Sequence, residues 1–340
     1  MTDLANPEWP FRAWIQRCAK LLKRKIPDLL ALARNNDPFL IGGEEEIKKG
    51  RWFAELWKVI ESPRDIHLRS MHYALLHSNV RNLDGTPYEN TEEQWELLQI
   101  ASKCGRVLRM VPAEAFVDRR NPPPILPAWI QHLDEDIARV QPQILLPSEF
   151  EFRLPSIAMI GTYLLPDMSA PSVDGYQEDD YSDRPFYSEI WIEKSTQNHI
   201  LVPLCERLGV GLVTAVGIQS ISNAIQFLMR VQRLRKPGRI FYVSDFDPAG
   251  DGMPVSVARH LEFWRRFYAP ESDVALTPLA LTLQQVRDYN LPRTPIKKGD
   301  LRRAGFESDY GEGAVELDAL EGLRRSRRLR ILGSALHHTR

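Results

Sequence analysis

The feature that most constrains the fold is an alternation of apolar strands and helices between residues 187 and about 282. Short apolar runs at Ile190–Ile192, Gly211–Val216 and Ile240–Val243 predict strands. Helices are predicted up to Leu208, over Ile221–Leu234 and over Val255–Tyr268. Because strands that alternate with helices form a parallel sheet with right-handed crossovers, this part is predicted to be an α/β domain.

Acidic residues follow two of these strands directly. Glu193 follows one strand, and Asp245 and Asp247 follow another. Ligands of open parallel sheets lie beyond the carboxyl ends of the strands. Carboxylates two residues apart in an extended chain share a face and repel each other unless a cation lies between them, and Mg²⁺ prefers such oxygen ligands. The sequence therefore predicts a Mg²⁺ site formed by Glu193, Asp245 and Asp247.

A structural role for the aspartate pair remains open at this point. Aspartate is common in turns and at helix starts, so Asp245-Phe246-Asp247 alone also fits a capped turn. Pro248 and Gly250 predict a tight turn in which the backbone can approach a ligand closely. The separate strand that ends at Glu193 is what favours the metal interpretation.

The first 120 residues are predicted to be helical. Apolar residues recur at helical spacing from Phe11 to Leu22 and again over Trp52–Ile60, which predicts two helices. A third helix near Pro63 carries His72 and Tyr73, and a fourth begins at the capping pattern of Thr91. The apolar run Val107–Val111 is predicted to be one strand of a wing. Short helices followed by a small hairpin indicate a winged-helix module, which is a common DNA-docking unit.

The predicted organisation is multidomain. It comprises a helical winged-helix domain (1–120), a proline-rich and then acidic linker (121–186), an α/β domain (187–290) and a basic C-terminal extension (291–340) packed on that domain.

Charge and cysteine content narrow the function classes. The net charge of −1 gives no global attraction to nucleic acid, so DNA contacts must come from local patches. The three cysteines are an odd number without a CxxC pair, which argues against disulfides and zinc. We expect no membrane span, no leader and a cytoplasmic, nucleoid-associated protein. Two basic patches, each of which also fits a solvated helix face, consist of Arg12, Arg17, Lys20, Lys23, Arg24 and Lys25, and of Arg324, Arg325, Arg327, Arg328 and Arg330.

Three motifs carry a resemblance to a known family. Glu189–Lys194, Gly217–Ser220 and Asp245–Gly250 resemble the Toprim domain of the A subunit of topoisomerase VI, and look closest to its small stand-alone A-type relatives. Meiotic double-strand-break proteins share this pattern. The family has a nucleophilic tyrosine four residues after an arginine, and Arg69 and Tyr73 match that spacing. The preceding His72 is a departure, because relatives usually have an aromatic residue there.

This resemblance implies an activity. The family cleaves double-stranded DNA with Mg²⁺, forms a 5′-phosphotyrosyl link, and acts as a homodimer in which the tyrosine of one subunit meets the metal site of the other. Tyr73 would be the nucleophile, Arg69 would contact the phosphate, and Lys194 would assist the carboxylates. Strand passage in topoisomerase VI needs an ATPase B subunit, and this chain has no GxxxxGK[ST] motif, so full DNA relaxation needs a separate ATPase partner unless the small A-type proteins work alone.

Other interpretations stay open on the sequence alone. Tyr73 also fits a core aromatic, because Leu68, Met71 and Leu75 surround it, and Arg69 also fits an ion pair with Asp65. A second hypothesis is a Toprim nuclease in which metal-activated water attacks DNA. A third is a non-catalytic DNA-binding protein with a relic acidic site.

Overall fold

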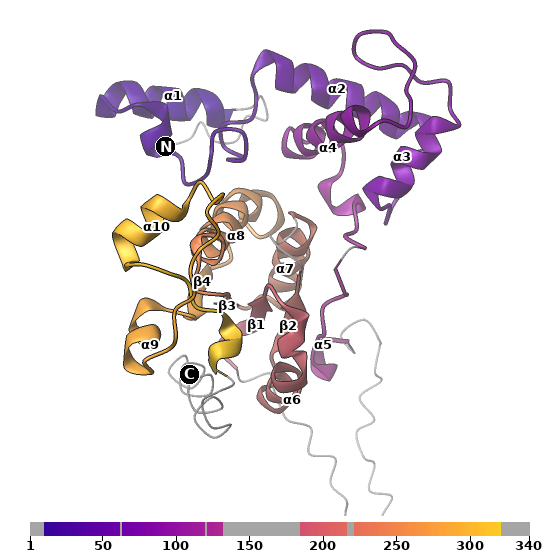
Figure 1. The fold of residues 1–340 in the computed structure, drawn as a ribbon. Coiled ribbons are helices and arrows are strands. Elements are labelled where there is room, and N and C mark those ends of the chain that lie inside the picture. Colours follow the sequence, from indigo (N-terminus) through magenta and orange to yellow (C-terminus); the bar gives the residue numbers. More distant parts are fainter. Residues whose placement is uncertain (1–9, 62, 120, 132–183, 216–220, 321–340) are drawn as a thin grey trace, which may run out of the picture.

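The computed structural model describes residues 10–61, 63–119, 121–131, 184–215 and 221–320 (Figure 1). Its elements in chain order are α1 (Pro10–Leu22), η1 (Ile26–Leu29), α2 (Glu44–Val59), α3 (Leu68–Leu76), α4 (Glu92–Val107), η2 (Ala113–Ala115), α5 (Ala128–Gln131), β1 (Tyr187–Ile192), η5 (Ser195–Gln197), α6 (Asn198–Leu208), β2 (Gly211–Thr214), α7 (Ile221–Leu234), β3 (Gly238–Val243), α8 (Pro248–Tyr268), β4 (Val274–Ala280), α9 (Leu283–Asp288), α10 (Arg303–Tyr310) and η6 (Leu317–Leu320).

A four-stranded parallel sheet organises the second half of the chain. Its strand order is β2-β1-β3-β4, and Ile192 pairs with Thr214 on one side and with Val243 on the other. The α/β class and the three predicted strands are confirmed. The alternation of β1, α6, β2, α7 and β3 follows from apolar runs of strand length separated by helical repeats.

Both faces of this sheet are covered, which explains why its strands are almost continuously apolar. Trp191 and Tyr242 face the cluster formed with α7 and α8, whereas Ile190 and Phe241 face the cluster formed with α6, α9 and the chain after Leu291. The chain from Leu291 to Leu320 therefore packs on the sheet. Because β1 and β3 are parallel and end side by side, the acidic residues that follow them lie at the same edge of the sheet, the carboxyl end of the strands.

A buried ion pair ties α7 to β1. Glu189 has no exposed surface, and one of its carboxylate oxygens lies 2.6 Å from a guanidinium nitrogen of Arg230. The same carboxylate accepts hydrogen bonds from the Trp191 indole at 2.7 Å and from the Tyr187 hydroxyl. Because every charge in this group is paired, its burial is tolerated, and it fixes α7 against the strand that leads to Glu193.

The N-terminal helices agree with the sequence except at one segment. The predicted helices are observed as α1, α2, α3 and α4, and the hydroxyl of Thr91 accepts a hydrogen bond from the Gln94 amide at the start of α4. The predicted strand Val107–Val111 is wrong, because α4 continues to Val107 and then turns. A short apolar run fits a buried helix end as well as a strand. The winged-helix assignment stays a prediction.

The helical part and the sheet share a hydrophobic cluster. The ring of Phe11 on α1 lies 5.5 Å from that of Phe263 on α8, and the Arg259 guanidinium lies 2.9 Å from the buried Asp37 carboxylate. The segment before α5 also reaches the sheet, since Ile125 forms an isolated antiparallel bridge with Leu212 on β2. The N-terminal half is thus anchored to both α8 and the sheet edge.

Three of the predicted features lie outside the described residues: the Gly217–Ser220 motif, most of the linker and the arginines of the C-terminal patch. Among the helices that are described, none combines the length and apolar character needed to cross a bilayer.

Candidate acidic site at the sheet edge

Asp245 lies at the carboxyl end of β3 and is held from two sides. Its Oδ2 lies 2.6 Å from the Nζ of Lys194, and its Oδ1 accepts a hydrogen bond of 2.7 Å from the backbone amide of Leu317. Only 8% of its surface is exposed. A nearly buried carboxylate is tolerated when a cation and a hydrogen-bond donor satisfy its oxygens.

Asp247 begins α8 as its N-cap. Its Oδ1 accepts a hydrogen bond of 2.6 Å from the Gly250 amide, and Pro248 occupies the first turn. A Cβ atom at Gly250 would lie 2.0 Å from the carbonyl oxygen of Asp245, so only glycine fits this close approach. Asp247 therefore has the capping role that the sequence left open. The capped turn holds Asp245 and Asp247 together at the end of β3.

Glu193 follows β1, the strand next to β3. The pKa of Glu193 is raised by burial first, and then by the negative charges of Asp245 and Asp247, while Lys194 opposes the shift. Repulsion of this kind requires the carboxylates to lie near one another in a partly desolvated place. The structure thus brings together four of the predicted site residues, and it does so through the pairing of adjacent parallel strands.

The chemistry of these donors fits a hard divalent cation, since all three are carboxylates at one edge of a sheet. Their arrangement is nevertheless organised around Lys194, because its ammonium group contacts Asp245. Among the described residues, no group of three or more His, Cys, Asp or Glu side chains is arranged closely enough to hold a metal ion. Coordination of Mg²⁺ by Glu193, Asp245 and Asp247 stays a prediction, and it requires the lysine to release Asp245.

Glu316 and Asp318 also lie near Lys194, and the sequence alone assigned them no role. Burial lowers the pKa of Lys194, but the bond to Asp245 and the charges of Asp245, Glu316 and Asp318 outweigh it, so the pKa lies above its usual value. Asp318 accepts a hydrogen bond from the Gln197 side chain. The backbone pairing of Phe246 with Val315 positions this segment.

Tyr73 is half exposed, at 50% of its surface, on α3. The interpretation of Tyr73 as a core aromatic is therefore wrong. The core position beside it belongs to His72, which is fully buried. Its ring nitrogens lie 2.7 Å from the Tyr88 hydroxyl and 3.1 Å from Oδ1 of Asn90. The hydrogen-bonding groups of the buried His72 ring are thus satisfied by Tyr88 and Asn90. The neighbouring Tyr73 remains half exposed to solvent.

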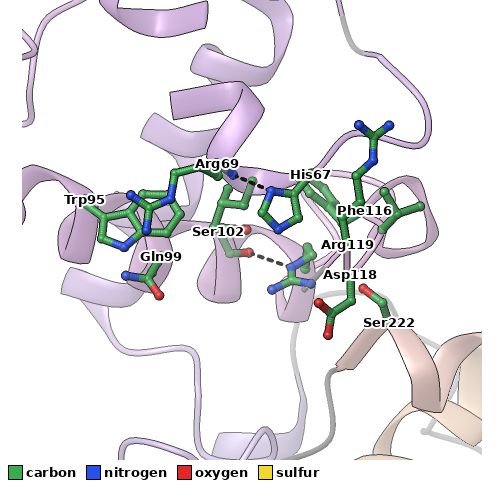
Figure 2. A pocket seen from close by; sticks show the side chains of 12 residues that line it. His67, Arg69, Trp95, Gln99, Ser102, Phe116, Asp118, Arg119 and Ser222 are labelled. Carbon is green, nitrogen blue, oxygen red and sulfur yellow. Dashed lines mark hydrogen bonds between the residues drawn. The ribbon is translucent and has the colours of Figure 1, made fainter. Parts of the chain in front are cut away.

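Arg69 does not pair with Asp65 in the structure. Its guanidinium carbon lies 4.2 Å from the centre of the Trp95 ring, a cation–π contact, and Figure 2 shows the two side chains against each other. Both residues line a pocket of 580 Å³ that Tyr73 does not line. Arg69 and Tyr73 share a helix, one turn apart, but Arg69 faces the pocket.

The helix that carries Tyr73 lies apart from the sheet that carries the acidic site. Figure 1 shows α3 apart from the sheet, with α7 between α3 and the strands β1 and β3. The two halves of the predicted machinery are therefore separate in a single subunit.

Comparisons with known proteins assign no family. No protein-family model matches the sequence, and no curated protein gives a significant match.

Proposed function

We propose that this protein is a Mg²⁺-dependent DNA-cleaving enzyme of the type IIB topoisomerase kind, built on a Toprim-like acidic site. The observation that supports this best is the convergence of three carboxylates at the ends of two adjacent parallel strands, where burial first, and then the charges of Asp245 and Asp247, raise the pKa of Glu193. Carboxylates rarely gather at a strand end for stability alone, because their mutual repulsion costs free energy, and here the ion pair of Lys194 with Asp245 offsets part of that cost.

The side chains have distinct roles in this proposal. Glu193, Asp245 and Asp247 would hold Mg²⁺, which supplies charge stabilisation to a phosphodiester in the transition state. Asp247 is oriented by the Gly250 amide, and Asp245 by the Leu317 amide, so both carboxylates are fixed in advance. Lys194 forms an ion pair with Asp245 and is positioned to contact a phosphate once released from it.

Tyr73 would be the nucleophile. Its phenolic oxygen attacks the phosphorus and loses its proton, a 5′-phosphotyrosyl bond forms, and the bond to the 3′ oxygen breaks, so that this oxygen leaves as a hydroxyl after protonation. The half-exposed position of Tyr73 suits access to DNA. Because α3, which carries Tyr73, lies apart from the sheet of its own chain, we propose a homodimer in which each tyrosine serves the partner's acidic site.

A second candidate function, a water-dependent nuclease, is favoured by the separation of α3 from the sheet. Within one chain the acidic residues gather at the sheet edge without Tyr73, which suits a nuclease in which Mg²⁺-bound water would attack DNA and Tyr73 would have no chemical role. The two candidates differ in one product, because only the first leaves protein covalently attached to DNA.

The basic patch around α1 could bind the phosphates of double-stranded DNA. Arg12 is already engaged, since it lies 3.3 Å from the Glu46 carboxylate. The remaining basic residues of the patch are exposed, and they form no ion pair with any described residue: Arg17, Lys20, Lys23, Arg24 and Lys25. Unpaired exposed cations of this density favour phosphate contacts. Full DNA relaxation would additionally need a separate ATPase subunit.

The test is a plasmid-cleavage assay quenched with detergent. Purified protein, supercoiled plasmid and Mg²⁺ should give nicked or linear DNA with protein attached. Tyr73→Phe should abolish both cleavage and attachment, whereas Tyr289→Phe, a matched change at a partly exposed tyrosine of α9's C-cap, should change neither. Cleavage without attachment in wild type, unchanged in Tyr73→Phe, would identify the water-dependent nuclease.

The acidic site is tested in the same assay. Glu193→Gln should eliminate cleavage, whereas Glu206→Gln at an exposed position of α6 should not. Full cleavage by Glu193→Gln would refute both candidates.

A further inference from the structure

A second site lies away from the sheet edge, between the N-terminal helices and α7. The pocket of 580 Å³ is formed by the start of α3, the face of α4, the chain from Phe116 to Arg119 and Ser222 at the start of α7 (Figure 2). Its volume falls within the range of roughly 300–1,000 Å³ that is typical of small-molecule sites. Its residues come from four separate segments, so the folded molecule creates it.

The lining of the pocket carries more basic than acidic side chains. Arg69, Arg106 and Arg119 line it, and none of them forms an ion pair with a described residue. The one acidic side chain of the lining, Asp118, accepts a hydrogen bond from the side-chain amide of Asn121. Burial lowers the pKa of Arg106 to about 10, and the charge of Asp118 opposes that shift without outweighing it. Arginines that converge without carboxylate partners favour an anionic ligand with several oxygen acceptors, such as a phosphate.

A buried hydroxyl faces the same space. Ser102 has no exposed surface, it lines the pocket, and its Oγ has no hydrogen-bond partner. Buried polar groups are nearly always satisfied, so an unpartnered hydroxyl at the wall of a cavity points to a polar ligand. The Arg106 side chain is held beside it by a hydrogen bond of 3.4 Å from Nε to the Ser102 carbonyl.

Two other features define the ligand further. The first turn of α7 carries backbone N–H groups and the positive end of the helix dipole, and Ser222 places that turn at the pocket. At the other end, the flat Arg69 guanidinium lies over the Trp95 ring. Arginine and tryptophan planes are surfaces on which nucleobases stack.

We infer that this pocket binds one nucleoside phosphate. The phosphate lies toward Arg106, Arg119, Ser102 and the start of α7, and the base lies against Arg69 and Trp95. The ligand is a free nucleotide or the terminal nucleotide of a DNA strand, because the buried position of Ser102 excludes the interior of a duplex. This site goes beyond the proposed cleavage reaction and does not depend on it.

Binding is measured by isothermal titration without Mg²⁺, so that the result is independent of cleavage. The probes are adenosine 5′-monophosphate, adenosine, inorganic phosphate, and a trinucleotide with or without a 5′ phosphate. Adenosine monophosphate should bind saturably, and adenosine and phosphate should each bind at least about tenfold more weakly, since each lacks one half of the recognition. Whichever of adenosine monophosphate and the phosphorylated trinucleotide binds more tightly identifies the source.

Variants locate the binding. Arg106→Gln and Arg119→Gln should each weaken adenosine monophosphate binding by about tenfold or more. Arg119 is exposed, so its replacement tests the site even if the partly buried Arg106 is needed for folding. Arg51→Gln, at an exposed position of α2 outside the pocket, is the matched control and should bind as wild type does. Absent saturable binding, phosphate binding as tight as that of the nucleotide, or unchanged binding by Arg119→Gln would each overturn the inference.

Discussion

Gly250 is the position where a single methyl group should damage the acidic site most selectively. A Cβ added there would lie 2.0 Å from the carbonyl oxygen of Asp245 and 3.0 Å from its carbonyl carbon. Both are backbone atoms, which cannot rotate away. Gly250→Ala should therefore displace the turn that holds Asp245 and Asp247, and with it the hydrogen bond from the Gly250 amide to Asp247.

The magnitude follows from opposing effects. Forcing extra volume into a packed position costs about 1–3 kcal/mol, and loss of an N-cap bond costs about 1 kcal/mol more. Alanine in place of glycine returns about 1 kcal/mol through helix propensity. Gly252, two residues along the same helix, has no atom within 4 Å of an added Cβ, so Gly252→Ala should stabilise the protein by about 0.5–1 kcal/mol.

Urea unfolding of the two variants, followed by circular dichroism, measures this difference. Gly250→Ala should be less stable than wild type by about 1–3 kcal/mol and should lose DNA cleavage, whereas Gly252→Ala should retain both. Equal stability of the two variants would refute the close approach at Gly250.

Three further outcomes are expected. Arg230→Met should destabilise the fold by about 3–5 kcal/mol in urea unfolding, because it leaves the Glu189 carboxylate buried without its cation. Arg239→Met removes an ion pair with the exposed Asp273 and should cost less than about 1 kcal/mol. Tyr88→Phe should cost about 1 kcal/mol through loss of the hydroxyl bond to His72, and an unchanged melting curve would contradict this. Burial, aided by the charge of Arg106, lowers the pKa of His260 to about 4 from 6.5. Unfolding then takes up a proton, so stability should fall as the pH drops from 6.5 toward 4, and His260→Gln should flatten that part of the stability profile.

The parallel sheet could be predicted because its central strands are short, apolar and buried on both faces. The acidic site followed from the same pattern, since Glu193 and Asp245 come directly after adjacent strands. β4 is less apparent in the sequence, because its first residues alternate between partly and fully exposed positions and it contains Pro278. An edge strand tolerates such a proline, whereas a central one does not.

Other features depend on contacts that local patterns do not encode. α8 begins at Pro248, seven residues before the predicted start, because Asp247 caps it despite the glycines and prolines that follow. His67 delays the start of α3 to Leu68, since its side chain accepts a hydrogen bond from the Arg69 amide. The nucleoside-phosphate pocket could not be predicted, because its residues come from four segments that only the tertiary fold brings together.

Titration of the protein with Mg²⁺ by calorimetry is the most direct test of the acidic site. Wild type and Glu206→Gln should each bind a single ion per chain, and Glu193→Gln and Asp245→Asn should bind it at least about tenfold more weakly. Binding of Mg²⁺ by Glu193→Gln with the affinity of wild type would contradict the claim that carboxylates from two strands hold one ion.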